Sequence, residues 1–210
     1  MKYQAIVLAA GEGKRAGLSY NKILYKIGEE SIIFLAAKKF IDDDECEKIY
    51  IVYNEKDLME LKTIFNNYNK VSYVCGGKSR QQSVYNALIN ITSDYVLIHD
   101  GARPYFSYNL LNRLKENILS ASCVIPVIDS VDSLKIVENN IVVKTINREK
   151  IKRVQTPQAF ITNILLSAHQ KATSNTYADD SAIIEDLTNE KILVVDGETQ
   201  NIKYTNLEDF

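Results

Sequence analysis

The chain of 210 residues contains little proline, little cysteine and no excess of positive charge, and each shortage excludes a class of protein. With three prolines and no low-complexity tract, no linker between domains is evident, and the length suits one α/β domain better than two. The cysteines Cys46, Cys75 and Cys123 are odd in number, far apart and without histidines at metal-ligand spacing. We therefore expect one domain over residues 1–210, with reduced and mostly buried thiols.

Charge and hydropathy give no sign of a nucleic-acid or membrane partner. The formal net charge is −2 and the sequence pI is about 5.8, so any phosphate must be bound by local charge. No apolar run approaches the length of a membrane span, and the N-terminus enters a predicted strand without a signal-peptide pattern. These features predict a cytoplasmic protein.

Short β-branched runs alternate with segments of helical period as far as Val127. The predicted strands are Tyr3–Ala9, Lys48–Tyr53, Val71–Cys75, Tyr95–His99 and Ser122–Val127. The predicted helices are Ser31–Phe40, Glu55–Phe65, Arg80–Ile91 (with Ser79 as its N-cap) and Tyr108–Leu119. This alternation is typical of a mainly parallel, Rossmann-like sheet with helices on both faces. Ligands bind such sheets at the carboxyl ends of the strands, so the loops that begin at Ala10, Gly76 and Asp100 should converge.

After Val127 the pattern changes. Residues 133–137 and 141–145 flank the turn formed by residues 138–140, which predicts a β-hairpin inserted at about 133–147. An isolated hairpin is marginally stable, and this one carries Ile136, Val137, Ile141 and Val143. We expect an arm that projects from the domain and buries these side chains against a second subunit, giving a homodimer. The alternative is a hairpin that folds back on its own domain.

A glycine-rich loop, residues 8–15 (LAAGEGKR), follows the first predicted strand. Glycines allow close approach of the backbone, and successive N–H groups in such a loop can hold phosphate oxygens. Lys14, Arg15 and the later Lys22 add positive charge where a triphosphate could lie. The loop is not a Walker A motif, because no Gly-Lys-Ser/Thr follows at the required spacing.

A dinucleotide-binding fingerprint is formally matched by Gly11, Gly13 and Ala16. That motif requires an acidic residue about 20 positions further on, near the end of the second strand, and this strand is followed by Asn54 instead. The two bulky cations of the loop also stand where a dinucleotide fold usually has small residues. The loop therefore favours a nucleotidyltransferase, in which an Arg and a Lys hold a triphosphate; an ordinary glycine-rich turn is the alternative.

A second polar cluster, residues 99–104 (HDGARP), directly follows an apolar strand. Asp100 should lie at the carboxyl end of the sheet near the glycine-rich loop, where a carboxylate suits Mg²⁺ shared with triphosphate oxygens. Alternatively, Asp100 caps a turn and pairs with Arg103. We expect His99 to be packed or hydrogen-bonded rather than catalytic.

These motifs, together with later ones, resemble the cytidylyltransferases that act on polyol phosphates. The similarity continues through CGGKSRQQSV (75–84), DSLK (132–135), TINR (145–148), QTPQ (155–158), ADD (178–180) and NIKYT (201–205). It covers nearly the whole chain in order and is greatest to the family that uses 2-C-methyl-D-erythritol 4-phosphate in the non-mevalonate isoprenoid pathway. Enzymes that use ribitol 5-phosphate share most of these motifs and are the alternative; a non-catalytic nucleotide-binding module is a third possibility.

The resemblance implies transfer of CMP from CTP to a polyol phosphate with release of pyrophosphate. It implies that Arg15, Lys22 and Lys203 bind the triphosphate, and that Asp100 holds Mg²⁺ and helps to place the sugar. The residues around the nucleotide would be Ala9, Ala10, Gly11, Glu12, Gly13, Gly77, Lys78, Ser83 and Gly101. Those around the polyol phosphate would be Arg103, Ser133, Arg148 and Thr156, the last two reaching across from the partner's arm.

Three positions depart from the family's usual pattern. Asn21 stands where proline usually precedes the loop lysine, which suggests a looser approach of Lys22. Ser133 replaces a threonine and keeps the hydroxyl, whereas Ala178 replaces a threonine and removes a hydrogen-bond donor. These departures affect the acceptor side more than the CTP side.

Overall fold

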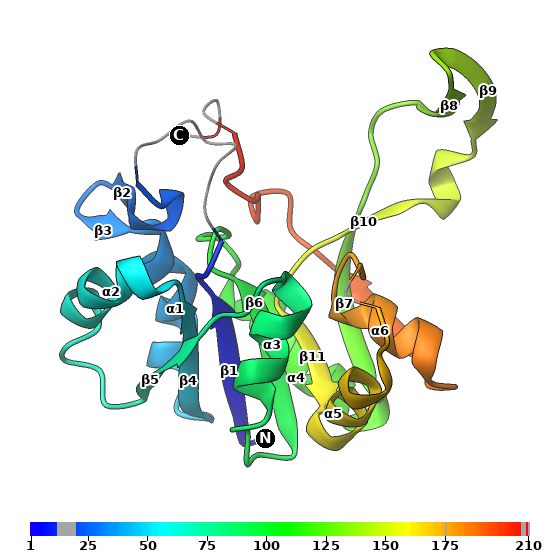
Figure 1. Ribbon diagram of the computed structural model, residues 1–210. Helices are drawn as coiled ribbons and strands as arrows, with labels where there is room; N and C mark the ends of the chain where they lie inside the picture. The colour runs from blue at the N-terminus through cyan, green and yellow to red at the C-terminus, as the bar shows by residue number, and fades with distance from the viewer. Residues whose placement is uncertain (12–19, 175, 207–208, 210) are drawn as a thin grey trace.

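The computed structural model describes residues 1–11, 20–174, 176–206 and 209 (Figure 1). In these ranges one eight-stranded sheet has the order β10-β7-β11-β6-β1-β4-β5, with β12 paired to β7. Its strands are β1 (Tyr3–Leu8), β4 (Cys46–Tyr53), β5 (Val71–Cys75), β6 (Tyr95–Asp100), β7 (Cys123–Asp129), β10 (Lys152–Val154), β11 (Gln158–Ile161) and β12 (Ile192–Asp196). The predicted α/β class is thereby confirmed.

The sheet is mainly parallel, as predicted. Strands β5, β4, β1 and β6 are all parallel neighbours, so their carboxyl ends lie at one edge. Strand β11 runs antiparallel between β6 and β7, β10 continues antiparallel along β7, and β12 pairs parallel with β7. The sequence pattern did not predict β10, β11 or β12.

Helices cover both faces of the sheet (Figure 1). One apolar cluster contains residues of α1 (Ile32–Asp42), α2 (Leu58–Ile64) and α4 (Tyr108–Asn117), and a second contains residues of α3 (Arg80–Leu88), α5 (Thr162–Lys171) and α6 (Asp180–Leu187). Alternate residues of β1 belong to different clusters: Ala5 and Val7 to the first, Ile6 to the second. This two-residue alternation is why a strand covered on both faces is apolar throughout.

Local hydrogen bonds explain where several helices begin. The Ser79 hydroxyl accepts from the Gln82 N–H, which confirms the predicted N-cap of α3. The predicted helix 55–65 is instead a 3₁₀ turn, η3 (Glu55–Asp57), followed by α2, because Asn54 caps the turn before the α-helix begins. Further short elements are η2 (Lys22–Leu24), β2 (Lys26–Ile27), β3 (Glu30–Ser31), η4 (Ile118–Ser120) and η5 (Arg148–Lys150).

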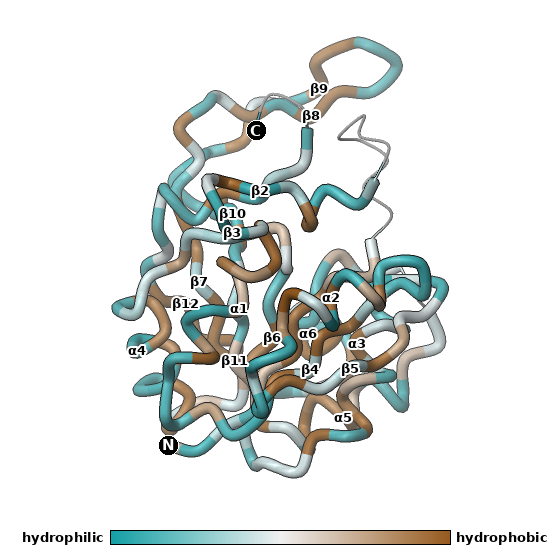
Figure 2. The backbone as a smooth tube through the Cα atoms, turned by 90° about the vertical axis from the view of Figure 1, so that its left-hand side faces the viewer, coloured by the Kyte–Doolittle hydropathy of each residue, from teal (hydrophilic) through white to brown (hydrophobic). Residues whose placement is uncertain are grey.

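The predicted hairpin is formed by β8 (Leu134–Glu138) and β9 (Ile141–Ile146). Asn139 and Asn140 both have positive φ, 49° and 65°, as a two-residue hairpin turn requires. The hairpin stands away from the sheet and its helices (Figure 1), with hydrophobic segments outside the body of the molecule (Figure 2). The exposed fraction of Ile141 is 69 %, and Ile136, Val137, Val142 and Val143 are also exposed. The hairpin therefore projects and does not fold back on its own domain.

The cysteines and the helix lengths agree with the composition. Cys46 and Cys123 are buried and Cys75 is exposed, all three as free thiols. No helix within the described ranges is long and apolar enough to cross a membrane.

Candidate active site

A cleft of about 620 Å³ lies at the carboxyl ends of β1, β5 and β6. The loops that begin at Ala10, Gly76 and Asp100 converge there, as the sequence predicts. Of the residues predicted to surround a nucleotide, the cleft is lined by Ala9, Ala10, Gly11, Gly77, Lys78, Ser83 and Gly101. Arg15, Glu12 and Gly13 lie outside the described residues, so the structure does not test their roles.

Two predicted lysines reach this cleft from distant parts of the chain. Lys22 begins the 3₁₀ helix η2, and Lys203 lies in the C-terminal segment, which is tied to the body by the Tyr204 N–H bonded to the Ala102 carbonyl at 2.9 Å. Both lysines line the cleft with Asp100. Asn21 is buried and hydrogen-bonded, so its replacement of proline does not leave Lys22 loosely attached.

Asp100 is the last residue of β6 and the centre of a cluster of cations. Its carboxylate accepts a hydrogen bond from Lys203 Nζ at 2.6 Å, and lies 3.6 Å from Arg80 Nε and 3.9 Å from Arg103 Nε. The Asp100 side chain is 13 % exposed. Burial opposes its ionisation, but the charges of Arg80, Lys203 and Arg103 outweigh burial and hold the pKa of Asp100 well below its usual range. Asp100 is therefore a carboxylate at neutral pH.

The described residues of the cleft fit Mg²⁺ that is shared with a bound triphosphate. Among the described residues, no group of three or more His, Cys, Asp or Glu could hold a metal ion by itself. Among the described residues that line the cleft, Asp100 is the one carboxylate. Mg²⁺ commonly binds through one or two carboxylates plus substrate phosphates, so this donor set fits a nucleotide-bound ion and not a protein-only site.

His99 and Thr156 form a buried chain beneath Asp100. His99 Nε2 lies 2.9 Å from the Arg103 carbonyl, which can only accept, so Nε2 carries the proton and Nδ1 accepts from the Thr156 hydroxyl at 2.9 Å. Thr156 Oγ1 in turn accepts from the Asp100 N–H at 3.0 Å. Burial lowers the pKa of His99 to about 3, which keeps the ring neutral. His99 is thus packed and hydrogen-bonded, as expected.

The expectation that Thr156 reaches a substrate from the partner's arm is wrong. Thr156 is buried in the body of its own subunit, where its hydroxyl is used by His99 and Asp100. It follows β10, outside the hairpin. In this structure its hydroxyl supports the Asp100 backbone, and contact with the acceptor stays a prediction.

Arg103 also occupies a different environment from the one predicted. Its side chain is 13 % exposed, Nη1 donates to the Asn201 carbonyl at 2.8 Å, and Nε faces Asp100. Asn201 is buried, and its Nδ2 donates to the Thr156 carbonyl at 2.8 Å. Arg103 therefore connects Asp100 to the segment that carries Lys203 and does not line the cleft.

The remaining predicted acceptor residues lie near the base of the arm. Ser133 and Arg148 are both exposed, and Arg148 Nη1 donates to the Val131 carbonyl at 2.7 Å. Neither lines the cleft of its own chain. The structure thus separates the predicted nucleotide residues from these two predicted acceptor residues.

Two glycines are required by close approach of the backbone. A Cβ on Gly101 would lie 2.7 Å from the Leu8 carbonyl oxygen, where β1 and β6 leave the sheet side by side. A Cβ on Gly77 would lie 2.2 Å from the Gln82 side chain. The Gly77 N–H donates to Ser83 Oγ, which itself donates to the Ser79 carbonyl, so Ser83 shapes the loop after β5.

Arg80 and Asp180 belong to the site although only their motifs pointed to them. Arg80 Nη1 donates to the fully buried Asp180 at 2.7 Å while Nε faces Asp100. His169 lies 3.4 Å from the other oxygen of Asp180. Arg80 stands three residues before Ser83, and their common helix α3 was the signal that could have placed it at the cleft.

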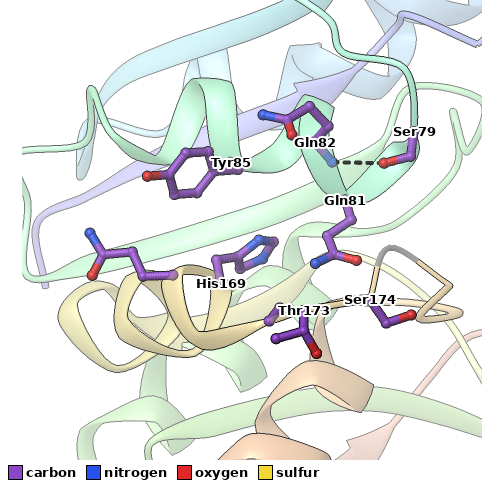
Figure 3. Close-up of a pocket in the computed structure, with 9 residues that line it drawn as sticks. Ser79, Gln81, Gln82, Tyr85, His169, Thr173 and Ser174 are labelled. Atoms are coloured by element: carbon purple, nitrogen blue, oxygen red, sulfur yellow. Dashed lines mark hydrogen bonds between the residues drawn. The ribbon is translucent and has the colours of Figure 1, made fainter.

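A second cavity, of about 400 Å³, lies between α3 and the end of α5 (Figure 3). The His169 ring lies beside Tyr85, with ring centroids 6.3 Å apart, and Gln81 is close by (Figure 3). The other lining residues carry amides, hydroxyls or a methyl group, with no formal charge. None of the predicted catalytic residues lines it.

Comparison with known proteins identifies the family. The family model IspD, 2-C-methyl-D-erythritol 4-phosphate cytidylyltransferase, matches residues 3–210. The chain belongs to this family. It is accordingly a CTP-dependent cytidylyltransferase.

Individual relatives agree over nearly their full length. The enzymes so named from Geobacillus thermodenitrificans and Bacillus anthracis are each 37 % identical to this chain, over 215 and 220 aligned residues that cover 94 % of each relative and 100 % and 99 % of this chain. The crystal structure of 4-diphosphocytidyl-2C-methyl-D-erythritol synthase from Anaerococcus prevotii aligns with a TM-score of 0.89 at 31 % identity, covering 99 % of this chain and 92 % of that one. The fold and the family are therefore those that the motifs predicted.

Proposed function

We propose that this enzyme transfers CMP from CTP to 2-C-methyl-D-erythritol 4-phosphate, giving CDP-methylerythritol and pyrophosphate. The observation that carries the proposal is the cleft in which Lys22, Lys203 and Asp100 meet at the glycine-lined ends of the strands. Relatives named for this reaction match the chain from end to end.

The chemistry needs no protein nucleophile. A phosphate oxygen of the acceptor attacks the α-phosphorus of CTP in line, and the bond from that phosphorus to the bridging oxygen of pyrophosphate breaks. Negative charge grows on the α-phosphate and on the leaving group, where the ammonium groups of Lys22 and Lys203 stabilise it, with Arg15 in the same role. The enzyme therefore acts by positioning and electrostatic stabilisation.

Lys203 and Asp100 form an ion pair in the cleft, and each has a separate partner in a metal-bound triphosphate. Bound Mg²⁺ would neutralise triphosphate oxygens, and Asp100 is the residue that would hold it. Lys203, released from Asp100, is then available to the α-phosphate. Arg80 is held by its ion pair with Asp180, and its Nε, 3.6 Å from Asp100, favours the ionised Asp100 carboxylate even when Lys203 moves away.

The acceptor site would be completed by a second subunit. The arm exposes five large aliphatic side chains of β8 and β9. Exposing so much apolar surface is unfavourable, and an isolated hairpin is only marginally stable. A symmetric dimer through the arm would bury them and bring the partner's Arg148 and Ser133 toward this cleft. Arginine suits the acceptor phosphate because its guanidinium can bond two oxygens at once.

Release of pyrophosphate from CTP and Mg²⁺ tests the proposal, with each polyol phosphate supplied in turn. Turnover with 2-C-methyl-D-erythritol 4-phosphate at a kcat/KM well above that with ribitol 5-phosphate is the expected result. The reverse order would transfer the enzyme to the ribitol branch. Binding of CTP by folded protein without turnover of either acceptor would indicate a non-catalytic module.

A further inference from the structure

Behind the cleft, the side chains of Asn21 and Asp57 are buried together. Asn21 Nδ2 donates to Asp57 Oδ2 at 2.8 Å and to the Ala9 carbonyl at 3.2 Å. Asn21 and Asp57 are each 6 % exposed, and they lie 36 positions apart in the chain. A hydrogen bond from an amide to a buried carboxylate is stronger than one between neutral groups.

This contact joins three segments that are far apart in the chain. Ala9 follows β1, Asp57 ends the turn η3 before α2, and Asn21 immediately precedes Lys22. The other end of the Asn21 side chain, Oδ1, accepts from the Ile23 N–H at 3.4 Å. One amide group therefore contacts the sheet, the η3 turn and the backbone on the far side of Lys22.

The segment that carries Lys22 has little internal stability. It is a single 3₁₀ turn of three residues, closed by bonds from the Leu24 and Tyr25 N–H groups to the carbonyls of Asn21 and Lys22. Turns of this length are not stable by themselves. The direction in which Lys22 leaves the backbone thus depends on what anchors the turn to the body.

We propose that Asn21 and Asp57 are positioning residues for Lys22, acting through the orientation of η2. Asn21 borders the cleft, but its side-chain amide is used by Asp57, the Ala9 carbonyl and the Ile23 N–H. The inference rests on the proposed function only in assigning Lys22 to the triphosphate. Asp57 is not among the residues that line the cleft, and its side chain does not cap α2, so its buried carboxylate serves Asn21. Displacement of a catalytic group by about 1 Å can cost on the order of 10²-fold in rate, so a small change of anchor suffices.

A cycle of four enzymes tests this proposal: wild type, Asn21→Ala, Asp57→Ala and the double variant. Each single variant should lower kcat roughly tenfold, and the double variant should be no slower than the worse single one, because both changes remove one contact. Asn117→Ala is the matched control, since Asn117 also bonds a backbone carbonyl, that of Arg113, but on α4 away from the cleft. Thermal midpoints and circular dichroism establish that each variant is folded at the assay temperature.

The same substitutions in a Lys22→Ala background separate positioning from general damage. If Asn21 and Asp57 act through Lys22, adding Asn21→Ala or Asp57→Ala to Lys22→Ala should change single-turnover rates less than about twofold. A further tenfold loss in that background, unchanged kcat in both single variants, or additive losses in the double variant would each overturn the inference. Absence of CMP transfer by the wild type would instead refute the proposed function and leave these contacts as folding contacts.

Discussion

In the cleft, Asp100 is the last residue of the central strand β6, and three cations lie within 4 Å of its carboxylate. Beneath it, His99 and Thr156 form a buried chain of hydrogen bonds. On the arm, Arg148 and Ser133 are exposed, and the nearby aliphatic side chains lie in solvent. The two regions belong to one proposed reaction but differ in how the rest of the chain packs around them. The cleft is held by the core of a single chain, whereas the arm offers surfaces that a single chain does not cover.

This difference indicates how the two substrates are handled. A preformed cluster of charges can bind a triphosphate at once, because its groups need no reorganisation. A site that is completed by a second subunit depends on assembly as well as on side-chain identity. Substitutions in the cleft and on the arm should therefore affect different kinetic parameters.

The largest expected effect is that of Lys22→Met in the cleft. Loss of one ammonium group that faces the developing charge should lower kcat by about 10²–10³-fold, or about 2.7–4 kcal/mol of barrier. Pyrophosphate release at saturating substrates measures it, and Lys26→Met, which removes an exposed cation four residues away, is the control. Rates near wild type in folded Lys22→Met would contradict the proposal that Lys22 stabilises the developing charge in the cleft.

Opening the proposed dimer interface of the arm should come next in size. Val143→Glu places a charge among exposed aliphatic groups, so the protein should sediment as a monomer and lose at least tenfold in kcat/KM for the acceptor. Calorimetric affinity for CTP should stay within about twofold, because the cleft lies within one chain. A Val143→Glu enzyme that stays dimeric, or a monomer that is fully active, would contradict the division between the two regions.

An effect of similar size, but confined to the acceptor and without loss of the dimer, is expected for Arg148→Ala. If Arg148 binds the acceptor phosphate as proposed, removing its guanidinium should raise the KM for the acceptor by roughly 10–100-fold, the 1.5–3 kcal/mol typical of a charged hydrogen bond, with the KM for CTP unchanged. Lys144→Ala removes another exposed cation of the arm and should leave both values unchanged. Equal shifts in both variants would show that only general arm charge matters.

The smallest expected effect is on stability and comes from His99. Because burial lowers its pKa to about 3, the unfolded chain binds a proton below pH 6.5 that the native state does not. The free energy of unfolding should therefore decrease as the pH is lowered below 6.5, and the loss should reach about 2 kcal/mol at pH 5. Urea unfolding at pH 7, 6 and 5 should show a shallower fall for His99→Gln; parallel pH dependences would indicate that His99 does not contribute.

The sequence located the cleft better than it located the contacts within it. Strands β1, β4, β5 and β6 are apolar runs whose ends are marked by local polar signals, so the convergence of their loops follows from parallel topology. Strand β11 is four residues long, begins with a buried glutamine and pairs with strands far away in the chain, so no local pattern distinguishes it.

The roles of Thr156 and Arg103 show what motifs leave open. Both follow from the family motif as residues of the site, yet Thr156 supports Asp100 through its N–H and through His99, and Arg103 points to Asn201. The motif did not reveal these contacts within the protein, and the contacts of both residues with the acceptor stay predictions. The bond between Asn21 and Asp57 is likewise absent from any pattern, because it joins two turns 36 positions apart.

Mixing two inactive enzymes tests most directly whether one chain's cleft works with its partner's arm. A Lys22→Met subunit has an intact arm, and an Arg148→Glu subunit has an intact cleft, so a hybrid dimer contains one site with both. After joint unfolding and refolding in equal amounts, about a quarter of wild-type turnover should return, since half of the dimers are hybrids with one intact site of two. Turnover that stays at the level of the two separate variants would contradict the account, because it would place cleft and arm in the same subunit.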